Sequence, residues 1–459
     1  MHSLIRIPYG AAGAMSRLAV AMAPAGDSKF FRAMTARRGL LGRYVAWSSS
    51  SRDPARPLLW VHAPSVGEGL QALPVLERFR AQRPDAQVAY TFFSPSAERF
   101  AQGVGADFHD YLPFDAAGDT ALALDSLRPT AIVFSKLDVW PLLVEQAAAR
   151  GVKVGLLSAT VPESSRRRSG LALLALRDAY ASLDVVGAIS PSDAERLLGM
   201  GVRGDRMTVT GDTRYDQVWA KANAPSESRD ALLQRYDDPR PTLVAGSTWP
   251  SDEQRLLPAW IQARRQLPQT RLIIAPHELS EAHLAAIVKW ARESSLSLSR
   301  TSETMSKPTD VVLVDQYGIL ADMYALGHAA YVGGGFHDAG LHSMLEPAAY
   351  GAPVLIGPMH ADNRDARLLT GGGGAVRCPG SGDITARILA WFRNPQVLRK
   401  AGASARRVVE AGIGAADRST ELVLSLFQRR SPGNFGTEND TDPRCERHSQ
   451  RPRGTANKR

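Results

Sequence analysis

Residues 58–94 read LLWVHAPSVGEGLQALPVLERFRAQRPDAQVAYTFFS. The apolar run at 58–63 is typical of a strand that is buried on both faces of a sheet. A short turn leads into 70–83, where apolar side chains recur at helical spacing, and a second apolar run follows at 87–94. A strand, a helix and a second strand in that order predict the repeating unit of a parallel α/β sheet.

The same alternation recurs along the chain in two series. It predicts an α/β fold with two doubly wound, Rossmann-like domains, each with helices on both faces of its sheet. Further strands are expected at 131–135, 153–158, 185–190, 242–246, 271–276, 311–314, 330–333 and 353–356. Further helices are expected at 120–127, 141–150, 251–266, 280–294, 344–350, 363–370, 397–411 and 415–427.

A polar stretch at 220–241 shows no strong strand pattern, and we interpret it as a connection between domains. We therefore expect a leader at 1–45, an N-terminal domain at 46–220 and a C-terminal domain at 221–429. The tail at 430–459 is polar and nearly free of apolar side chains, which predicts disorder. Because doubly wound sheets bind ligands beyond the carboxyl ends of their strands, both domains should face a shared cleft.

The chain has 459 residues and a net charge of +9, and the position of that charge is informative. Seven basic side chains against one acidic side chain lie in 1–45, and seven against four lie in 430–459. The remaining body is neutral, which argues against a nucleic-acid-binding protein although the sequence pI is about 9.7. A basic leader favours contact with an anionic membrane surface.

The leader itself leaves alternatives open. Residues 4–23 are weakly apolar, but Arg6, Pro8 and Arg17 interrupt the run, so a full transmembrane helix is not expected. The Ala-Met-Ala at 21–23 resembles a signal-peptide cleavage site, although Arg17 argues against that interpretation. A disordered or simply packed leader is the third alternative.

The sequence shows no signature of a metal site or a redox cofactor. Its two cysteines, Cys378 and Cys445, cannot form a disulfide framework, and no CxxC or HExxH motif is present. The glycine-rich stretch at 333–335 is neither GxGxxG nor a Walker loop, which argues against NAD binding. No cofactor and no metal are therefore expected.

The first candidate site is HAPSVGEG at 62–69, where a strand ends and a helix begins. Ser65 with Glu68 three residues later has the pattern of a capping box, which is the purely structural interpretation. The functional interpretation is that Glu68 faces the cleft and accepts a proton as a general base. The residues alone do not decide between these interpretations.

The second candidate is AGSTWPSDEQ at 245–254, a strand followed by a turn of small residues and a helix. Ser247 and Thr248 could offer hydroxyl and backbone donors to an anion. The alternative is an ordinary turn in which Ser251 caps the helix.

The third candidate is GGGFHDAGLHSMLEP at 333–347. Gly334 and Gly335 allow a ligand to approach the backbone closely, and the loop up to His342 suits a phosphate group. Glu346, near the start of the next helix, suits hydrogen bonds to ribose hydroxyls.

Smaller candidates lie at the ends of other strands, where an ordinary turn residue is the competing interpretation. They are Pro276 and His277, the loop residue Gly318, and Asn363.

Several motifs occur in an order that matches a known family. They are HAPSVGEG at 62–69, YLPFD at 111–115, SKLDVWP at 135–141, AISPSDAERL at 188–197, GDTRYD at 211–216, AGSTWPSDE at 245–253 and GGGFHDAGLHSMLEPAAYGAPVLIGP at 333–358. Across roughly 38–425 the chain resembles the transferases of Gram-negative bacteria that attach 3-deoxy-D-manno-octulosonic acid (Kdo) to a lipid A precursor.

The resemblance implies a GT-B glycosyltransferase that moves Kdo from CMP-Kdo to lipid IVA, with inversion and without a metal. It implies a place in lipopolysaccharide biosynthesis at the cytoplasmic face of the inner membrane, peripheral or N-terminally anchored. Glu68 matches the family's catalytic glutamate. With the candidates above, the donor side comprises Ser247, Thr248, Pro276, His277, Gly318, Ile319, Leu320, Gly334, Gly335, His342, Glu346 and Asn363. The acceptor side comprises Ser65, Lys136, Asp138 and Arg214.

The chain also departs from the family's pattern. Lys136 stands where the family often has an acid, and His277 stands where an arginine is common. These departures keep two alternatives open: another GT-B enzyme that uses a UDP-sugar, or an inactive nucleotide-sugar-binding membrane scaffold.

Overall fold

The computed structural model describes residues 3–24, 26, 28–303, 307–360 and 363–428. The disorder expected for the tail at 430–459 concerns residues that lie outside this description.

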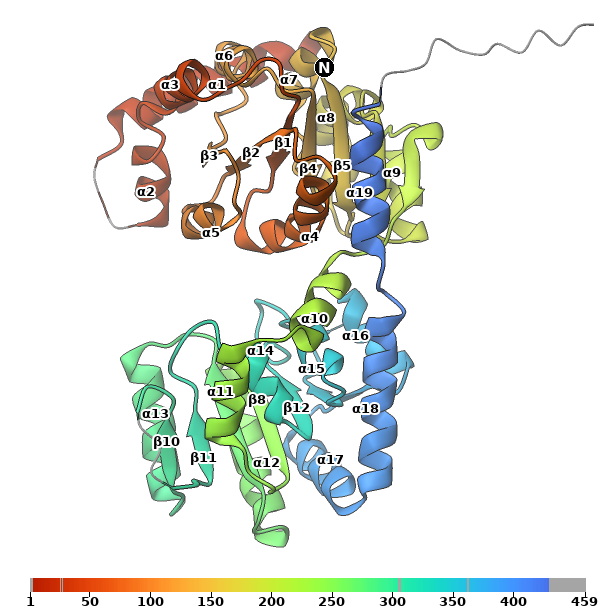
Figure 1. Ribbon diagram of the computed structural model, residues 1–459. Helices are drawn as coiled ribbons and strands as arrows, with labels where there is room; N and C mark the ends of the chain where they lie inside the picture. Colours follow the sequence, from red (N-terminus) through yellow and green to blue (C-terminus); the bar gives the residue numbers. More distant parts are fainter. Residues whose placement is uncertain (1–2, 25, 27, 304–306, 361–362, 429–459) are drawn as a thin grey trace, which may run out of the picture. The chain divides into compact units, whose positions relative to one another are not determined.

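Two parallel sheets of seven strands each form the framework of the protein (Figure 1). The first has the order β3-β2-β1-β4-β5-β6-β7, so the strand order reverses between β1 and β4. Its strands are β1 (Leu58–His62), β2 (Gln87–Phe92), β3 (Phe108–Tyr111), β4 (Ala131–Ser135), β5 (Lys153–Ala159), β6 (Val185–Ala188) and β7 (Met207–Val209). The helices and 3₁₀ turns along this part of the chain are α4 (Val66–Gln82), η1 (Pro95–Ala97), α5 (Glu98–Gly103), α6 (Ala117–Leu127), α7 (Pro141–Ala149), η2 (Arg166–Arg168), α8 (Gly170–Ala181), α9 (Pro191–Gly199) and η3 (Gly204–Arg206).

The second sheet has the order β10-β11-β9-β8-β12-β13-β14 and reverses between β8 and β12. Its strands are β8 (Thr242–Thr248), β9 (Arg271–Pro276), β10 (Leu298–Arg300), β11 (Val311–Leu313), β12 (Ala329–Val332), β13 (Val354–Ile356) and β14 (Ala375–Arg377). The helices and the 3₁₀ turn here are α11 (Glu227–Tyr236), α12 (Pro250–Gln266), α13 (Glu281–Glu293), α14 (Leu320–Met323), η4 (Tyr324–Leu326), α15 (Leu345–Ala349), α16 (Arg364–Gly371), α17 (Ser381–Arg393) and α18 (Pro395–Glu410).

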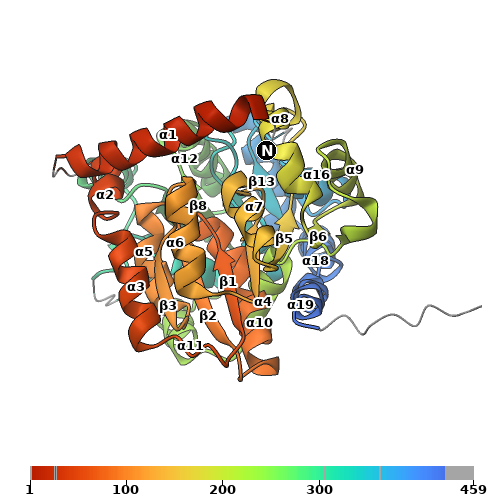
Figure 2. The ribbon, with the colours of Figure 1, turned by 90° about the horizontal axis from the view of Figure 1, so that it is seen from above.

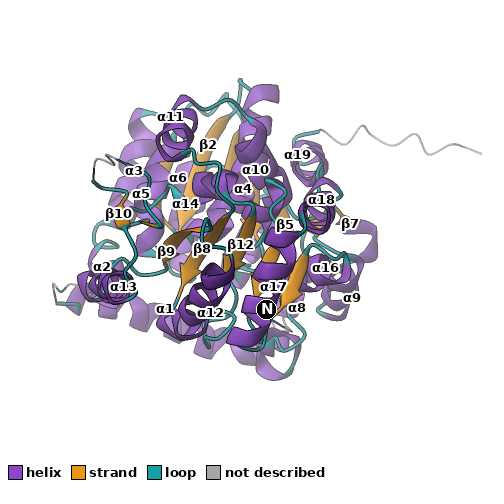
Figure 3. Cartoon of the chain, turned by 90° about the horizontal axis from the view of Figure 1, so that it is seen from below, coloured by secondary structure: helices purple, strands orange, loops and turns teal. Residues whose placement is uncertain are grey.

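Burial on both faces explains why the central strands form. Every residue of β1, β4 and β9 is buried, and helices flank the strands in each layer (Figure 3). Trp60 lies in the core of the first sheet, and Trp260 and Tyr331 lie in a core of the second. Each such apolar side chain contributes roughly 1.5–3 kcal/mol when it leaves water. The expected α/β class and all the expected strands are therefore confirmed, within two residues at their ends.

Four strands were not predicted, and all four are the outer strands of their sheets: β3, β7, β10 and β14. Each is three or four residues long and only partly buried. An outer strand lacks a neighbour on one side and so carries no continuous apolar run, which is the signal that the prediction used.

The leader folds into α1 (Ser3–Met22), α2 (Lys29–Thr35) and α3 (Leu40–Ser50). Figure 2 shows α1 as a long helix, and it packs against α2 and α8. In α3, Tyr44 is fully buried and its ring packs edge-on against Phe108. The described part of the leader is helical and packed rather than disordered, while its association with a membrane surface stays a prediction. Within the described residues, none of the helices is both long enough and apolar enough to span a membrane.

The polar stretch at 220–241 holds the end of α10 (Arg214–Asn223) and all of α11, so it is largely helical. The last described helix, α19 (Ala415–Ser425), follows the second sheet in sequence but packs against α4, β5 and β6 of the first (Figure 1). Val423 and Leu426 belong to the core of the first sheet. The sequence did not predict this return of the chain.

Candidate active site

Ser65 and Glu68 lie where β1 ends and α4 begins. Ser65 is the N-cap residue of α4, but its side chain makes no capping bond to the helix backbone. Its hydroxyl instead donates a hydrogen bond to Oε2 of Glu68. The capping box expected from the sequence is therefore wrong, because the hydroxyl is used to hold the carboxylate.

The other oxygen of the Glu68 carboxylate contacts a lysine. Lys136 Nζ lies 3.1 Å from Oε1 of Glu68, and the Glu68 side chain is only 16% exposed. Lys136 follows β4, and β4 neighbours β1 at the point where the strand order reverses. The Ser135 hydroxyl also donates to the backbone oxygen of Glu68, at 3.2 Å. The predicted base and the predicted acceptor-side lysine are thus in direct contact.

The Asp138 carboxylate holds neighbouring side chains at the end of β1 in place. Its Oδ2 lies 3.1 Å from Nε2 of the fully buried His62 and 3.1 Å from Nε1 of Trp140. Burial alone would raise the pKa of Asp138, but the hydrogen bonds from His62 and Trp140 outweigh burial and lower that pKa. Asp138 is therefore an ionised group that orients His62 at the end of β1.

Arg214, expected on the acceptor side, begins α10 and is held by two carboxylates. Its Nη2 lies 2.7 Å from Asp212 Oδ2 and 3.0 Å from Asp365 Oδ2. Burial alone would lower the pKa of Arg214, but these carboxylates raise it well above its usual range. Asp365 also accepts a hydrogen bond of 3.0 Å from the hydroxyl of Tyr215. Arg214 thus joins the segment after β7 to the start of α16.

In the second sheet, one carboxylate organises the glycine loop. Asp252, fully buried in the first turn of α12, accepts hydrogen bonds from the amides of Trp249, Gly334 and Phe336 and from the hydroxyl of Tyr331, at 2.8–3.3 Å. Two sequence expectations are corrected here. Ser251 does not cap α12, because the helix begins at Pro250 and Asp252 provides the side-chain bond. Asp252 was not among the predicted site residues, because an acid in a first helical turn is commonplace.

The second correction concerns the backbone of the glycine loop at 333–335, which was expected to lie open to a ligand. The Gly334 amide donates to Asp252, and the Gly333 amide donates to the oxygen of Gly246 at 3.0 Å. Both amides are therefore used inside the protein. Gly334 has φ +90°, and a Cβ there would overlap the oxygen of Gly340, whereas a Cβ on Gly335 would overlap the backbone of Gly357. These glycines are needed because three loops pack backbone against backbone.

Ser247 and Thr248 end β8 with different surroundings. Ser247 has φ +53°, at a point where the pairing of β8 with β9 shifts register. The buried Thr248 hydroxyl donates to Glu253 Oε1 at 2.7 Å, and Pro276 is its strand partner on β9. The proton of the Thr248 hydroxyl is therefore already donated to a protein group.

Trp249 lies at the centre of three histidines. His337 stacks on it with ring centroids 3.9 Å apart, and His277 stacks at 4.5 Å. Trp249 Nε1 donates to His342 Nε2 at 3.0 Å. Burial, and then the neighbouring His277, lower the pKa of His342 to about 4. His342 is therefore neutral near pH 7, and its place on the donor side stays a prediction.

Glu346 borders a cavity of about 150 Å³. Burial raises the pKa of this carboxyl. Gly318, with φ +93°, precedes Ile319 and Leu320 at the start of α14. The cavity is lined by Leu70 of α4, by Gln217, Val218, Lys221 and Ala222 of α10, by Ala321 of α14, and by Glu346 and Tyr350. Because Leu70 is two residues from Glu68, the helix that carries the predicted base also borders the pocket of the predicted nucleotide-side acid.

Asn363 has a structural role and lines a second cavity. Its side chain caps α16 by accepting a hydrogen bond of 3.0 Å from the amide of Ala366. It also lines a cavity of about 470 Å³ together with His337, Gly340 and His360.

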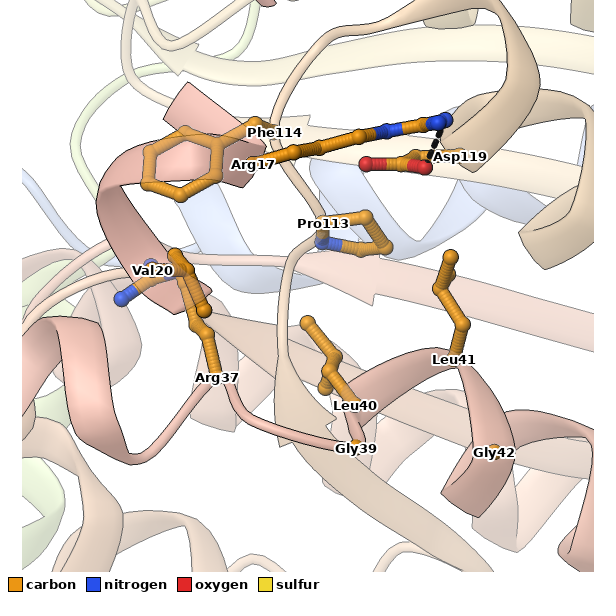
Figure 4. A pocket seen from close by; sticks show the side chains of 10 residues that line it. All are labelled: Arg17, Val20, Arg37, Gly39, Leu40, Leu41, Gly42, Pro113, Phe114 and Asp119. Carbon is orange, nitrogen blue, oxygen red and sulfur yellow. Dashed lines mark ion pairs between the residues drawn. The ribbon is translucent and has the colours of Figure 1, made fainter. Parts of the chain in front are cut away.

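A third cavity, of about 270 Å³, lies under the leader (Figure 4). Val20, Leu40, Leu41 and Phe114 give it an apolar lining, and Arg17, drawn in Figure 4, forms an ion pair with Asp119. The sequence did not predict this cavity, since its lining comes from the leader, from the loop after β3 and from α6.

The family model of 3-deoxy-D-manno-octulosonic-acid transferases (kdotransferases) matches residues 34–217. That segment contains the whole first sheet and the Glu68–Lys136 contact. The chain thus contains a segment, residues 34–217, that matches the Kdo transferase family domain. A Kdo transferase of Haemophilus influenzae is 24% identical over 86% of this chain and 92% of its own length. One of Bordetella pertussis is 29% identical over 82% and 89%.

Solved structures place the chain in the GT-B fold class. A UDP-GlcNAc 2-epimerase of Neisseria meningitidis aligns with 80% of this chain and all of its own, with a TM-score of 0.59 and 14% identity. A glycosyltransferase of Rickettsia africae covers 81% of this chain and 99% of its own, with a TM-score of 0.50 and 12% identity. At these identities the likeness concerns the fold alone, and it confirms the GT-B expectation.

Proposed function

We propose that this enzyme transfers Kdo from CMP-Kdo to a lipid A precursor, lipid IVA, with inversion at the anomeric carbon. The Kdo transferase domain match at residues 34–217 and the similarity to curated Kdo transferases support the sugar and the reaction type. The observation that carries the proposal is the position of α4. Its first turn holds Glu68, and its next residues reach the cavity beside Glu346.

In the proposed reaction the acceptor hydroxyl oxygen attacks the anomeric carbon of Kdo from the face opposite to CMP. The bond from that carbon to the phosphate oxygen breaks, and CMP leaves with the electron pair. Glu68 takes the proton of the acceptor hydroxyl as the new bond forms. Glu346 would bind ribose hydroxyls of the nucleotide.

The charge on the departing phosphate needs donors beyond the amides of Gly333 and Gly334, because these two are used internally. The N-terminus of α16 fits this role, since its cap residue Asn363 lines the 470 Å³ cavity. Fixed dipoles of this kind can take up the charge without a metal, and we propose that none is required.

On the acceptor side, the 270 Å³ cavity under the leader suits an acyl chain of the lipid, because its lining is largely apolar. Met15, Met22 and Phe30 are each at least 60% exposed on α1 and α2, within a leader that is strongly basic. Apolar side chains beside basic ones favour an anionic lipid surface. We therefore propose peripheral attachment to the cytoplasmic face of the inner membrane.

The test of this proposal is incubation with CMP-Kdo and a tetra-acyl lipid A precursor in excess chelator, followed by mass measurement of the lipid. We expect one or more Kdo additions, and Glu68→Gln to lower turnover about 10²–10⁴-fold with the fold intact. Glu77→Gln, an exposed acid on the same helix, should keep normal turnover.

Near-normal transfer by Glu68→Gln would refute the base role. Turnover with a UDP-sugar in place of CMP-Kdo, or inhibition by UDP but not by CMP, would favour the alternative GT-B enzyme. No turnover with either donor, but binding of CMP, would favour the scaffold.

A further inference from the structure

The contact between Lys136 and Glu68 is built into the backbone. Lys136 has φ +69°, a left-handed conformation that side chains other than glycine rarely adopt. Its amide donates to the oxygen of Leu157 at 2.8 Å, which fixes the residue between β4 and β5. Holding a lysine in such a conformation is unfavourable, and here the ammonium group contacts the carboxylate.

Among the neighbours of the Glu68 carboxylate described below, Lys136 is the one that carries a charge. Ser65 donates to one carboxylate oxygen and Lys136 to the other. The third neighbour is Tyr90 of β2, whose pKa is raised by burial and then by Glu68, so this phenol stays neutral. A cation in contact with a carboxylate stabilises the negative charge and thereby opposes transfer of a proton to it.

Lys136 is also the movable member of the pair. Its side chain is 46% exposed, against 16% for Glu68, and among the described residues Glu68 is the one carboxylate within ion-pair distance of it. An ion pair this exposed is weak and gives way to a competing anion. An acceptor that carries phosphate groups supplies such an anion beside the base.

We propose that Lys136 is a specificity-determining residue that restrains Glu68 until the anionic acceptor draws the ammonium away, and so favours transfer over hydrolysis of the donor. This inference rests on the proposed function. Without restraint, Glu68 would take a proton from water while the water oxygen bonds to the anomeric carbon. The bond to the phosphate oxygen would break, and free Kdo and CMP would result.

The test is CMP release from CMP-Kdo without acceptor, measured for the full-length protein and for Lys136→Met. We expect the enzyme-dependent hydrolysis to rise roughly tenfold, because the carboxylate loses its paired cation, and the KM for the lipid to rise. Lys136→Arg should restore low hydrolysis. The matched control is Lys153→Met, since Lys153 is 43% exposed and pairs with Asp184 at 3.0 Å.

The same substitution of Lys136 in the Glu68→Gln variant shows whether Lys136 acts through Glu68. In Glu68→Gln, the added Lys136→Met should leave hydrolysis at the level of Glu68→Gln alone. Unchanged hydrolysis in Lys136→Met, or an equal rise in the Glu68→Gln background, would overturn the inference while the proposed transfer stands. Absence of Kdo transfer from CMP-Kdo by the wild type would instead overturn the proposed function.

Discussion

At the scale of single residues, Asp252 has the largest structural consequence in the second sheet. Its two oxygens accept four hydrogen bonds from three backbone amides and one hydroxyl. In Asp252→Asn an amide NH₂ would face some of these donors, which leaves buried groups unpaired. We expect a loss of about 2–4 kcal/mol in the free energy of unfolding, measured by urea denaturation.

Asp230→Asn is the control, because the Asp230 side chain is 67% exposed in the first turn of α11. It should change the free energy of unfolding by less than about 0.5 kcal/mol. Equal stability of the two variants would contradict the role given to Asp252.

The residue scale also shows where prediction from the sequence stops. Glu68 and Glu346 were predicted from their places near strand ends and helix starts, and Lys136 was predicted from the family resemblance. The sequence could not show that Ser65 serves Glu68 rather than the helix, or that the Gly334 amide serves Asp252. Several partners compete for such donors, and tertiary packing decides among them.

At the scale of elements, α7 begins on a buried carboxylate. Asp115 accepts the amides of Leu142 and Leu143, both at 2.9 Å, and the hydroxyl of Tyr9 from α1 at 2.8 Å. Burial raises the pKa of Asp115 to about 6, against the effect of these hydrogen bonds. The folded protein thus holds this proton more tightly than the unfolded chain does.

The sign of the pH dependence follows from that shift. Asp115 contributes stability that is fully present below about pH 4 and is lost as the pH rises through about 6. We expect the stability of the wild type relative to Asp115→Asn to fall by up to about 3 kcal/mol across that range. Urea denaturation of both proteins at several pH values would measure it, and parallel pH profiles would contradict the assignment.

The same scale explains which elements the sequence revealed. Strands such as β1 and β9 are buried on both faces, so their apolar runs were visible. The outer strands β3, β7, β10 and β14 depend on a neighbour on one side only, and their short mixed sequences resemble loops. The leader helices were hidden because Pro8 and two glycines interrupt α1 in sequence while the helix continues through them.

At the scale of the whole molecule, exposed apolar residues on α1 and α2 predict membrane binding. Replacing Met15, Met22 and Phe30 by Ser should lower binding to anionic phospholipid vesicles at least tenfold, because each side chain contributes roughly 1.5–3 kcal/mol on burial. Flotation with vesicles measures this, and high salt should weaken binding of the wild type.

Serine at three exposed apolar positions elsewhere is the matched control. Leu122, Leu198 and Val397 are 38–45% exposed and lie outside the leader, and these substitutions should leave vesicle binding unchanged. Equal loss in both triple variants would argue against the leader as the membrane-binding surface.

The return of α19 to the first sheet makes that module discontinuous in the gene. A fragment that stops after β7 would expose the apolar core surface that Val423 and Leu426 cover. The packing of Phe79 against Phe427 would also be absent. Exchange of this module between homologous enzymes therefore needs two crossover points, the second of them ahead of residue 415. A chimera made with one crossover would pack α19 of one enzyme against the first sheet of the other.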